Sequence, residues 1–130
     1  MPRRMALIVA LAASAALGAC AKRTLPPGDI GVCYHVVTQK GGTLRFNKVV
    51  ENLPNLETCA ANLEAMRVKF LRMGGSNLDI MGAYQGNFIF IQREGVFTAP
   101  DLEAHPYLAL VRTGDGRLAI PGAMPQGAGR

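Results

Sequence analysis

The amino-acid sequence predicts a small α+β domain in which one long helix packs on an antiparallel sheet. Two observations define this class. Short β-rich runs flank glycine-containing turns at three places, which is the pattern of antiparallel hairpins. The stretch 55–73 repeats apolar residues at three- and four-residue spacing, as an amphipathic helix does. The chain has 130 residues, which is enough for one domain and too few for the larger enzyme folds.

Composition and charge narrow the class further. An apolar fraction of 49% with 18% charged residues is globular, which excludes a wholly disordered or collagen-like chain. The formal net charge is +5, and subtracting Arg3 and Arg4, which lie in a segment that we expect to be removed, leaves +3. Without a basic stripe, this charge predicts no nucleic-acid partner.

The first hairpin joins the runs 32–37 and 44–50. Placing a two-residue turn at the glycine pair 41–42 sets the register, so that Val37 faces Phe46. This register gives the hairpin two different faces, because side chains alternate along each strand.

One predicted face of this hairpin is mostly apolar. It carries Cys33 and places His35 opposite Lys48, and we expect the main helix to cover it. The other face is more mixed, and we predict that it is a possible binding face, made of an aromatic, a cationic and an amide side chain: Tyr34, Arg45 and Asn47.

The stretch 55–73 is the main predicted helix. Asn55 is suited to the N-cap and Glu57 to the first turn, where a negative charge is favourable. The glycine pair 74–75 then ends the helix. Cys59 falls on the apolar stripe, so it points toward the sheet.

The remaining elements complete the predicted order β-β-α-β-β-(short α)-β-β. Thr98 followed by Pro100 resembles a helix start, so a short helical turn is expected to about residue 104. The other segments form two hairpins, with strands expected at 78–84, 87–93, 107–112 and 117–120.

The N-terminus has the features of an export signal. Residues 1–4 are basic, and the apolar run 5–17 is too short to cross about 30 Å of hydrocarbon, so a secretory signal peptide is expected. The sequence Leu17-Gly18-Ala19-Cys20 resembles the lipobox of bacterial lipoproteins, in which an aliphatic residue and two small residues precede a cysteine.

This resemblance implies a diacylglycerol thioether on Cys20, cleavage just before it and acylation of the new N-terminus. The alternative is an ordinary secreted protein in which Cys20 is incidental. Ala21 stands where an aspartate would favour inner-membrane retention, so the expected location is the outer membrane, facing the periplasm. The chain then divides into four parts: signal peptide 1–19, lipidated Cys20 with a flexible tether (20–29), small α+β periplasmic domain 30–120 and disordered tail 121–130.

The cysteines fit an exported protein. With Cys20 lipidated, Cys33 and Cys59 remain as a pair, and an oxidising compartment favours a disulfide bond between them. Both are placed at the same interface, one by the sheet pattern and one by the helix pattern. A metal site is the alternative, but it needs further ligands and the chain has only His35 and His105 as imidazoles. We therefore predict no metal and no cofactor.

Motifs for enzyme chemistry are missing from the sequence, which contains no H-E-x-x-H, C-x-x-C, G-x-S-x-G or P-loop pattern. The leading hypothesis is a non-enzymatic envelope lipoprotein that binds a partner protein as an accessory or assembly factor. The alternative is a module that binds glycan or peptidoglycan through the sheet face. Its architecture loosely resembles the SPOR fold, although the element order differs. A third hypothesis is a small hydrolase that uses His35 with an unassigned carboxylate.

Overall fold

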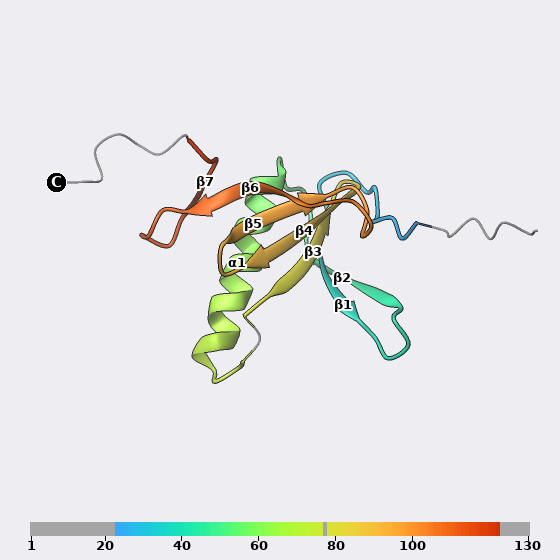
Figure 1. The fold of residues 1–130 in the computed structure, drawn as a ribbon, viewed down its shortest axis with the longest axis horizontal. Coiled ribbons are helices and arrows are strands. Elements are labelled where there is room, and N and C mark those ends of the chain that lie inside the picture. The colour runs from blue at the N-terminus through green and yellow to red at the C-terminus, as the bar shows by residue number, and fades with distance from the viewer. Residues whose placement is uncertain (1–22, 77, 123–130) are drawn as a thin grey trace, which may run out of the picture.

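A computed structural model describes residues 23–76 and 78–122, which form one seven-stranded antiparallel sheet with one helix against it (Figure 1). The strand order across the sheet is β2-β1-β3-β4-β5-β6-β7. The elements along the chain are β1 Cys33–Thr38, β2 Leu44–Val50, α1 Leu56–Arg72, β3 Ile80–Tyr84, β4 Asn87–Gln92, β5 Gly95–Ala99, β6 Tyr107–Arg112 and β7 Leu118–Ala119. The predicted α+β class, with one main helix on an antiparallel sheet, is confirmed.

The expected signal peptide, Cys20 and residues 123–130 of the expected tail lie outside the described residues. Within the described ranges, no helix is both long and apolar enough to cross a membrane.

Local sequence signals set both ends of α1. The Asn55 side chain accepts a hydrogen bond from the Thr58 backbone N–H at 2.9 Å, as expected of an N-cap. At the other end, the Gly75 N–H donates to the Phe70 carbonyl at 3.0 Å and the Gly74 N–H donates to Leu71 at 3.1 Å. This is a Schellman motif, and its left-handed position is Gly74, with a φ of 89°.

The predicted short helix from residue 98 to about residue 104 is wrong, because Thr98 and Ala99 belong to β5 and residues 100–104 form no helix. Thr98 lies in β5, pairs with Ile89 and donates its hydroxyl to the Phe88 carbonyl at 2.8 Å. The run Val96-Phe97-Thr98 is β-branched and aromatic, and this composition favours a strand. Asp101 does accept from the N–H groups of the second and third residues after it, but it stabilises only a turn.

The predicted register of the first hairpin is also wrong, by one residue over most of its length. Only the pair Cys33–Val50 is as expected; beyond a bulge between Cys33 and Tyr34, His35 pairs with Asn47 and Val36 with Phe46. The connecting loop has five residues, 39–43, instead of a two-glycine turn. Because a one-residue slip turns side chains to the opposite face, the two predicted faces do not exist as stated.

The main core lies between α1 and the sheet. A disulfide bond joins Cys33 to Cys59 with a Cα–Cα distance of 5.4 Å, as the two hydrophobic patterns predict. Leu63 of α1 packs over Gly82 of β3, where a Cβ atom would clash with the leucine side chain. The other fully buried members are Ala60 of α1 and three residues from the helix-facing side of the inner strands: Ile89, Ile91 and Val96.

The opposite face of the sheet carries a smaller aromatic core. The ring of Tyr34 lies edge-on to Phe46 at 6.2 Å, and Phe46 stacks on Phe88 at 6.3 Å. Strands β2 and β4 are separated by two other strands, a spacing of about 14 Å in a flat sheet. Their rings meet because the sheet curls toward this face.

Candidate functional site: a fork between β1 and β3

The most distinctive hollow lies where β1 and β3 separate. The two strands pair only from Cys33–Tyr84 to Val36–Met81, whereas β1 remains paired with β2 as far as Thr38. Figure 1 shows the β1–β2 hairpin bending away from β3 toward its tip. The resulting fork is closed on a third side by the C-terminal half of α1, and it encloses a volume of about 610 Å³.

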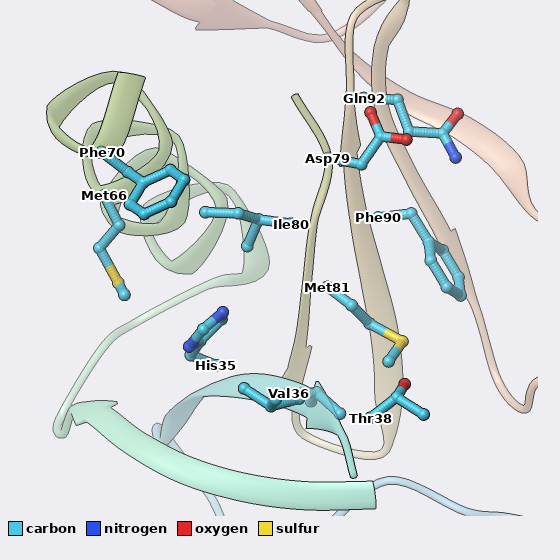
Figure 2. Close-up of a pocket in the computed structure, with 11 residues that line it drawn as sticks. His35, Val36, Thr38, Met66, Phe70, Asp79, Ile80, Met81, Phe90 and Gln92 are labelled. Carbon is cyan, nitrogen blue, oxygen red and sulfur yellow. The ribbon is translucent and has the colours of Figure 1, made fainter. Parts of the chain in front are cut away.

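The helix wall of the fork consists of Met66 and Phe70, one turn apart on α1 (Figure 2). The Schellman motif positions Phe70: the chain folds back so that Gly75 lies against the phenyl ring, and any Cβ atom there would clash with the ring. Despite this contact Phe70 remains exposed. The helix end therefore holds an aromatic ring at the mouth of the fork.

The strand walls are also apolar and include flexible side chains. β3 contributes Ile80 and Met81, β4 contributes Phe90, and β1 contributes Val36. Unbranched thioether side chains adapt to the shape of a bound group, and methionine is common on binding surfaces for that reason. Val37, which also lines the hollow, is exposed, as are Met73 and Leu78, which do not line it.

His35 is the main titratable group inside the fork. Its imidazole points from β1 toward Met66 and Ile80 in Figure 2. Burial lowers the pKa of His35 below its ordinary value, so the ring is neutral at pH 7. Asp79, the residue just before β3, also lines the hollow, but in Figure 2 it lies on the far side from His35. Among the described residues, His35 forms no ion pair.

The predicted pairing of His35 with Lys48 is not formed. Lys48 lies opposite Tyr34 and forms an ion pair with Glu51 at 2.7 Å. The cation expected to influence the imidazole is therefore occupied elsewhere.

The three residues of the predicted binding face do not share one face. Tyr34 is only 9% exposed on the aromatic side, and its hydroxyl donates to Asp29 at 2.6 Å. That hydrogen bond, burial and the charge of Asp29 raise the pKa of Tyr34. Arg45 and Asn47 face the other way, because they pair with Val37 and His35. They therefore stand beside the fork, while the tyrosine belongs to the small aromatic core.

The sequence did contain a signal for the fork that the hairpin pattern obscured. The apolar stripe of α1 continues through Phe70 to Met73, and these last positions extend beyond the part of the sheet that covers the stripe. Met73 is 70% exposed. When the apolar stripe of a helix continues past the sheet that covers it, the uncovered apolar residues indicate a surface that can bind another group.

A second hollow, of about 730 Å³, lies between the outer side of α1 and β7. One of its lining residues, Glu64, belongs to an ion cluster. Glu64 accepts two hydrogen bonds from Arg112, at 2.8 and 2.9 Å, and two from Arg67, at 2.9 and 3.1 Å. Arg112 also donates to the backbone carbonyls of Gln92 and Arg93, so the cluster ties α1 to the ends of β4 and β6.

Burial alone would raise the pKa of Glu64. The hydrogen bonds and charges of the two arginines outweigh burial and hold this pKa at about 2. The carboxylate therefore stays ionised, with both oxygens occupied by guanidinium groups. This arrangement links α1 to the sheet and engages both oxygens of Glu64.

Nowhere in the described ranges do three or more histidine, cysteine or acidic side chains gather as a metal site would require. No protein-family model, no curated protein and no solved structure matches this chain. The geometry of the fork is therefore the basis for a functional assignment.

Proposed function

We propose that this protein is a non-enzymatic lipoprotein of the bacterial cell envelope that binds a partner protein through the β1–β3 fork. One observation carries the proposal: a hollow with methionine and phenylalanine walls is surrounded by exposed apolar side chains. Surface apolar groups that gather around a hollow are typical of binding sites. The occupant that fits is a protein segment that inserts a large apolar side chain between β1 and α1.

Charge at the mouth defines the partner further. Lys40 and Arg45 belong to the hairpin arm of the fork, and neither forms an ion pair among the described residues. A partner segment with a carboxylate next to its apolar residue pairs with these cations. The expected ligand is therefore an acidic and apolar peptide segment.

The other two hypotheses have less support. A glycan-binding sheet face needs exposed aromatic and polar groups together, but Tyr34 and Phe88 are packed in the aromatic core. A hydrolase needs a nucleophile or an acid–base pair. In the fork His35 and Asp79 form no hydrogen bond with each other, and both Cys33 and Cys59 are bonded as a disulfide.

The proposed location rests on Cys20 and the cysteine pair. The lipobox-like sequence at 17–20 supports lipid attachment, and the disulfide bond is consistent with an oxidising compartment. Ala21 supports the outer membrane. We expect radiolabelled palmitate to enter the wild-type chain in cells and to be lost in the Cys20→Ala variant. Normal labelling of that variant would contradict the lipid anchor.

The binding site is tested by photo-crosslinking in living cells. A photoreactive amino acid at Val37 or Phe70 is expected to yield a discrete adduct with a partner protein, while the same group at Glu94, on the exposed β4–β5 turn, gives none. Met66→Glu places a charge inside the fork, so it should abolish the adducts. Adducts of equal yield from all positions would rule out the fork as the site. Sedimentation of the protein with purified sacculi would instead favour the glycan-binding alternative.

A further inference from the structure

The N-terminal segment of the described chain lies across one end of the sheet. The Gly31 N–H donates to the Gln85 side chain at 2.8 Å, and the Pro27 carbonyl accepts from the Gly86 N–H at 2.9 Å. Further along, Arg23 forms an ion pair with Asp101 at 3.5 Å. The segment therefore passes from the start of β1, over the β3–β4 turn, to the loop after β5 (Figure 1). We call this end of the molecule the anchor end.

Exposed apolar side chains gather at the anchor end. Ile30 is 89% exposed and Leu25 is 65% exposed, both in the segment itself. Leu102 is exposed in the neighbouring β5–β6 connection, next to the Asp101 that pairs with Arg23, and Tyr107 is exposed at the start of β6. Two carboxylates at this end are engaged: Asp101 by Arg23 and Asp29 by the Tyr34 hydroxyl. The tyrosine hydroxyl brings no charge to balance Asp29, and Glu103, next to Leu102, is exposed and forms no ion pair among the described residues. Contact of this end with lipid therefore depends on its apolar side chains and not on charge.

The short stretch of chain between Cys20 and Arg23 limits how far the anchor end can lie from a lipid attached to Cys20. Only three residue steps separate Arg23 from Cys20, and a fully extended chain covers at most about 10 Å in that distance. If Cys20 carries lipid, the membrane surface lies within about that distance of the point where Arg23 meets Asp101. A longer tether would allow any face of the domain to approach the membrane, whereas this one keeps the Arg23 end of the segment close to it.

We propose that the anchor end is a membrane-contact surface, in which Leu25, Ile30, Leu102 and Tyr107 rest on the lipid head groups and hold the domain in one orientation. The proposal rests on the proposed lipid anchor at Cys20. Tyrosine is suited to the membrane–water interface, because its ring is apolar and its hydroxyl stays in water, and leucine and isoleucine beside it can bury apolar surface at the boundary with the acyl chains. The partner of this surface is the lipid bilayer that holds the proposed anchor. In this orientation the fork, at the other end of β1 and α1, opens away from the membrane.

The test imposes the anchor chemically, so that it does not depend on natural lipidation. The mature chain 20–130 keeps every described residue, and with Cys33 and Cys59 bonded its one remaining thiol is Cys20. That thiol is coupled to a maleimide phospholipid in vesicles of phosphatidylethanolamine and phosphatidylglycerol. Backbone hydrogen exchange is then compared by mass spectrometry between the vesicle-bound and the free protein.

We expect vesicles to slow exchange severalfold at 23–31 and 100–107, and to leave the hairpin tip 39–43 and the helix end 73–76 unchanged. Leu102→Glu combined with Tyr107→Glu should restore free-protein exchange at the anchor end, whereas Met73→Glu with Leu78→Glu should not. Unchanged exchange at the anchor end, or slowing at the hairpin tip instead, would overturn the proposal. Failure of natural lipidation would show in the palmitate experiment and would not alter this result.

Discussion

The anchor end and the fork differ in how firmly the chain is tied together. At the anchor end the Cys33–Cys59 disulfide joins the start of β1 to the first turns of α1, and the Tyr84 hydroxyl donates to the Leu53 carbonyl at 2.7 Å. At the fork, β1 loses its β3 partner after Val36 and apolar side chains remain exposed. Ligand-binding regions are commonly drawn from the less tightly held parts of a fold. The domain is thus tightly held at the end where we propose that it is anchored, and it is more open at the end where we propose that it binds a partner.

The largest expected effect comes from cutting the disulfide at the anchor end. The Cys33→Ala/Cys59→Ala variant should lose roughly 2–5 kcal/mol of unfolding free energy, because its unfolded chain is no longer cross-linked. Urea unfolding of the oxidised wild type and the variant measures this difference. Cys20→Ala is the matched control and should keep the wild-type midpoint. Equal midpoints for all three proteins would mean that the disulfide does not hold this end.

The ion cluster on the far side of α1 should make the protein sensitive to acid. Burial raises the pKa of Glu64, but Arg112 and Arg67 lower it from 4.5 to about 2 in the folded state. A lowered folded-state pKa means that the stabilisation is complete above pH 4.5 and is lost as the pH falls toward 2, by about 3 kcal/mol. Urea unfolding between pH 7 and pH 2.5 measures the loss. In Glu64→Gln this part of the pH dependence should disappear, and a variant that follows the wild-type curve would contradict the assignment.

A single methyl group at the helix–sheet contact should have an intermediate effect. Gly82→Ala places a Cβ atom against Leu63 and 2.7 Å from the Tyr34 carbonyl oxygen, so the variant should lose roughly 1–3 kcal/mol. Thermal unfolding measures the cost, and the matched control is Gly28→Ala, where a Cβ atom meets nothing within 4 Å. A Leu63→Ala background should reduce the cost of the alanine. Additive effects of the two changes would show that the contact is not as close as described.

The sequence predicted the elements that depend on local signals. Asn55 and Gly74 define the ends of α1, because capping is decided by neighbouring residues. The disulfide was predictable as well, since two periodic patterns turned Cys33 and Cys59 toward one interface.

The errors in the first hairpin arose because the length of its turn sets the pairing of every residue along both strands. The glycine pair at 41–42 suggested a two-residue turn, but the loop extends over 39–43, which shifts the register by one residue. The bulge between Cys33 and Tyr34 reverses this shift, so the pair Cys33–Val50 agrees with the prediction. That slip moved Tyr34 to the face opposite Arg45. For the fork, the sequence offered only the apolar stripe of α1 that continues to Met73. The point where β1 and β3 separate could not be predicted, because the pairing of strands that are distant in sequence depends on both strands together.

Two exposed substitutions with very small effects on stability should best distinguish the functions of the fork and the anchor end. Met73 is exposed beside the fork and Leu102 is exposed at the anchor end, so Met73→Asp and Leu102→Asp should each change the unfolding free energy by about 0.5 kcal/mol or less. Met73→Asp should weaken the photo-adduct formed from Val37, because it puts a carboxylate beside an apolar site, and it should leave vesicle-dependent exchange at 100–107 intact. Leu102→Asp should do the reverse. If either variant changed both readouts equally, with unfolding unaltered, the two ends would not be independent surfaces and the comparison between them would fail.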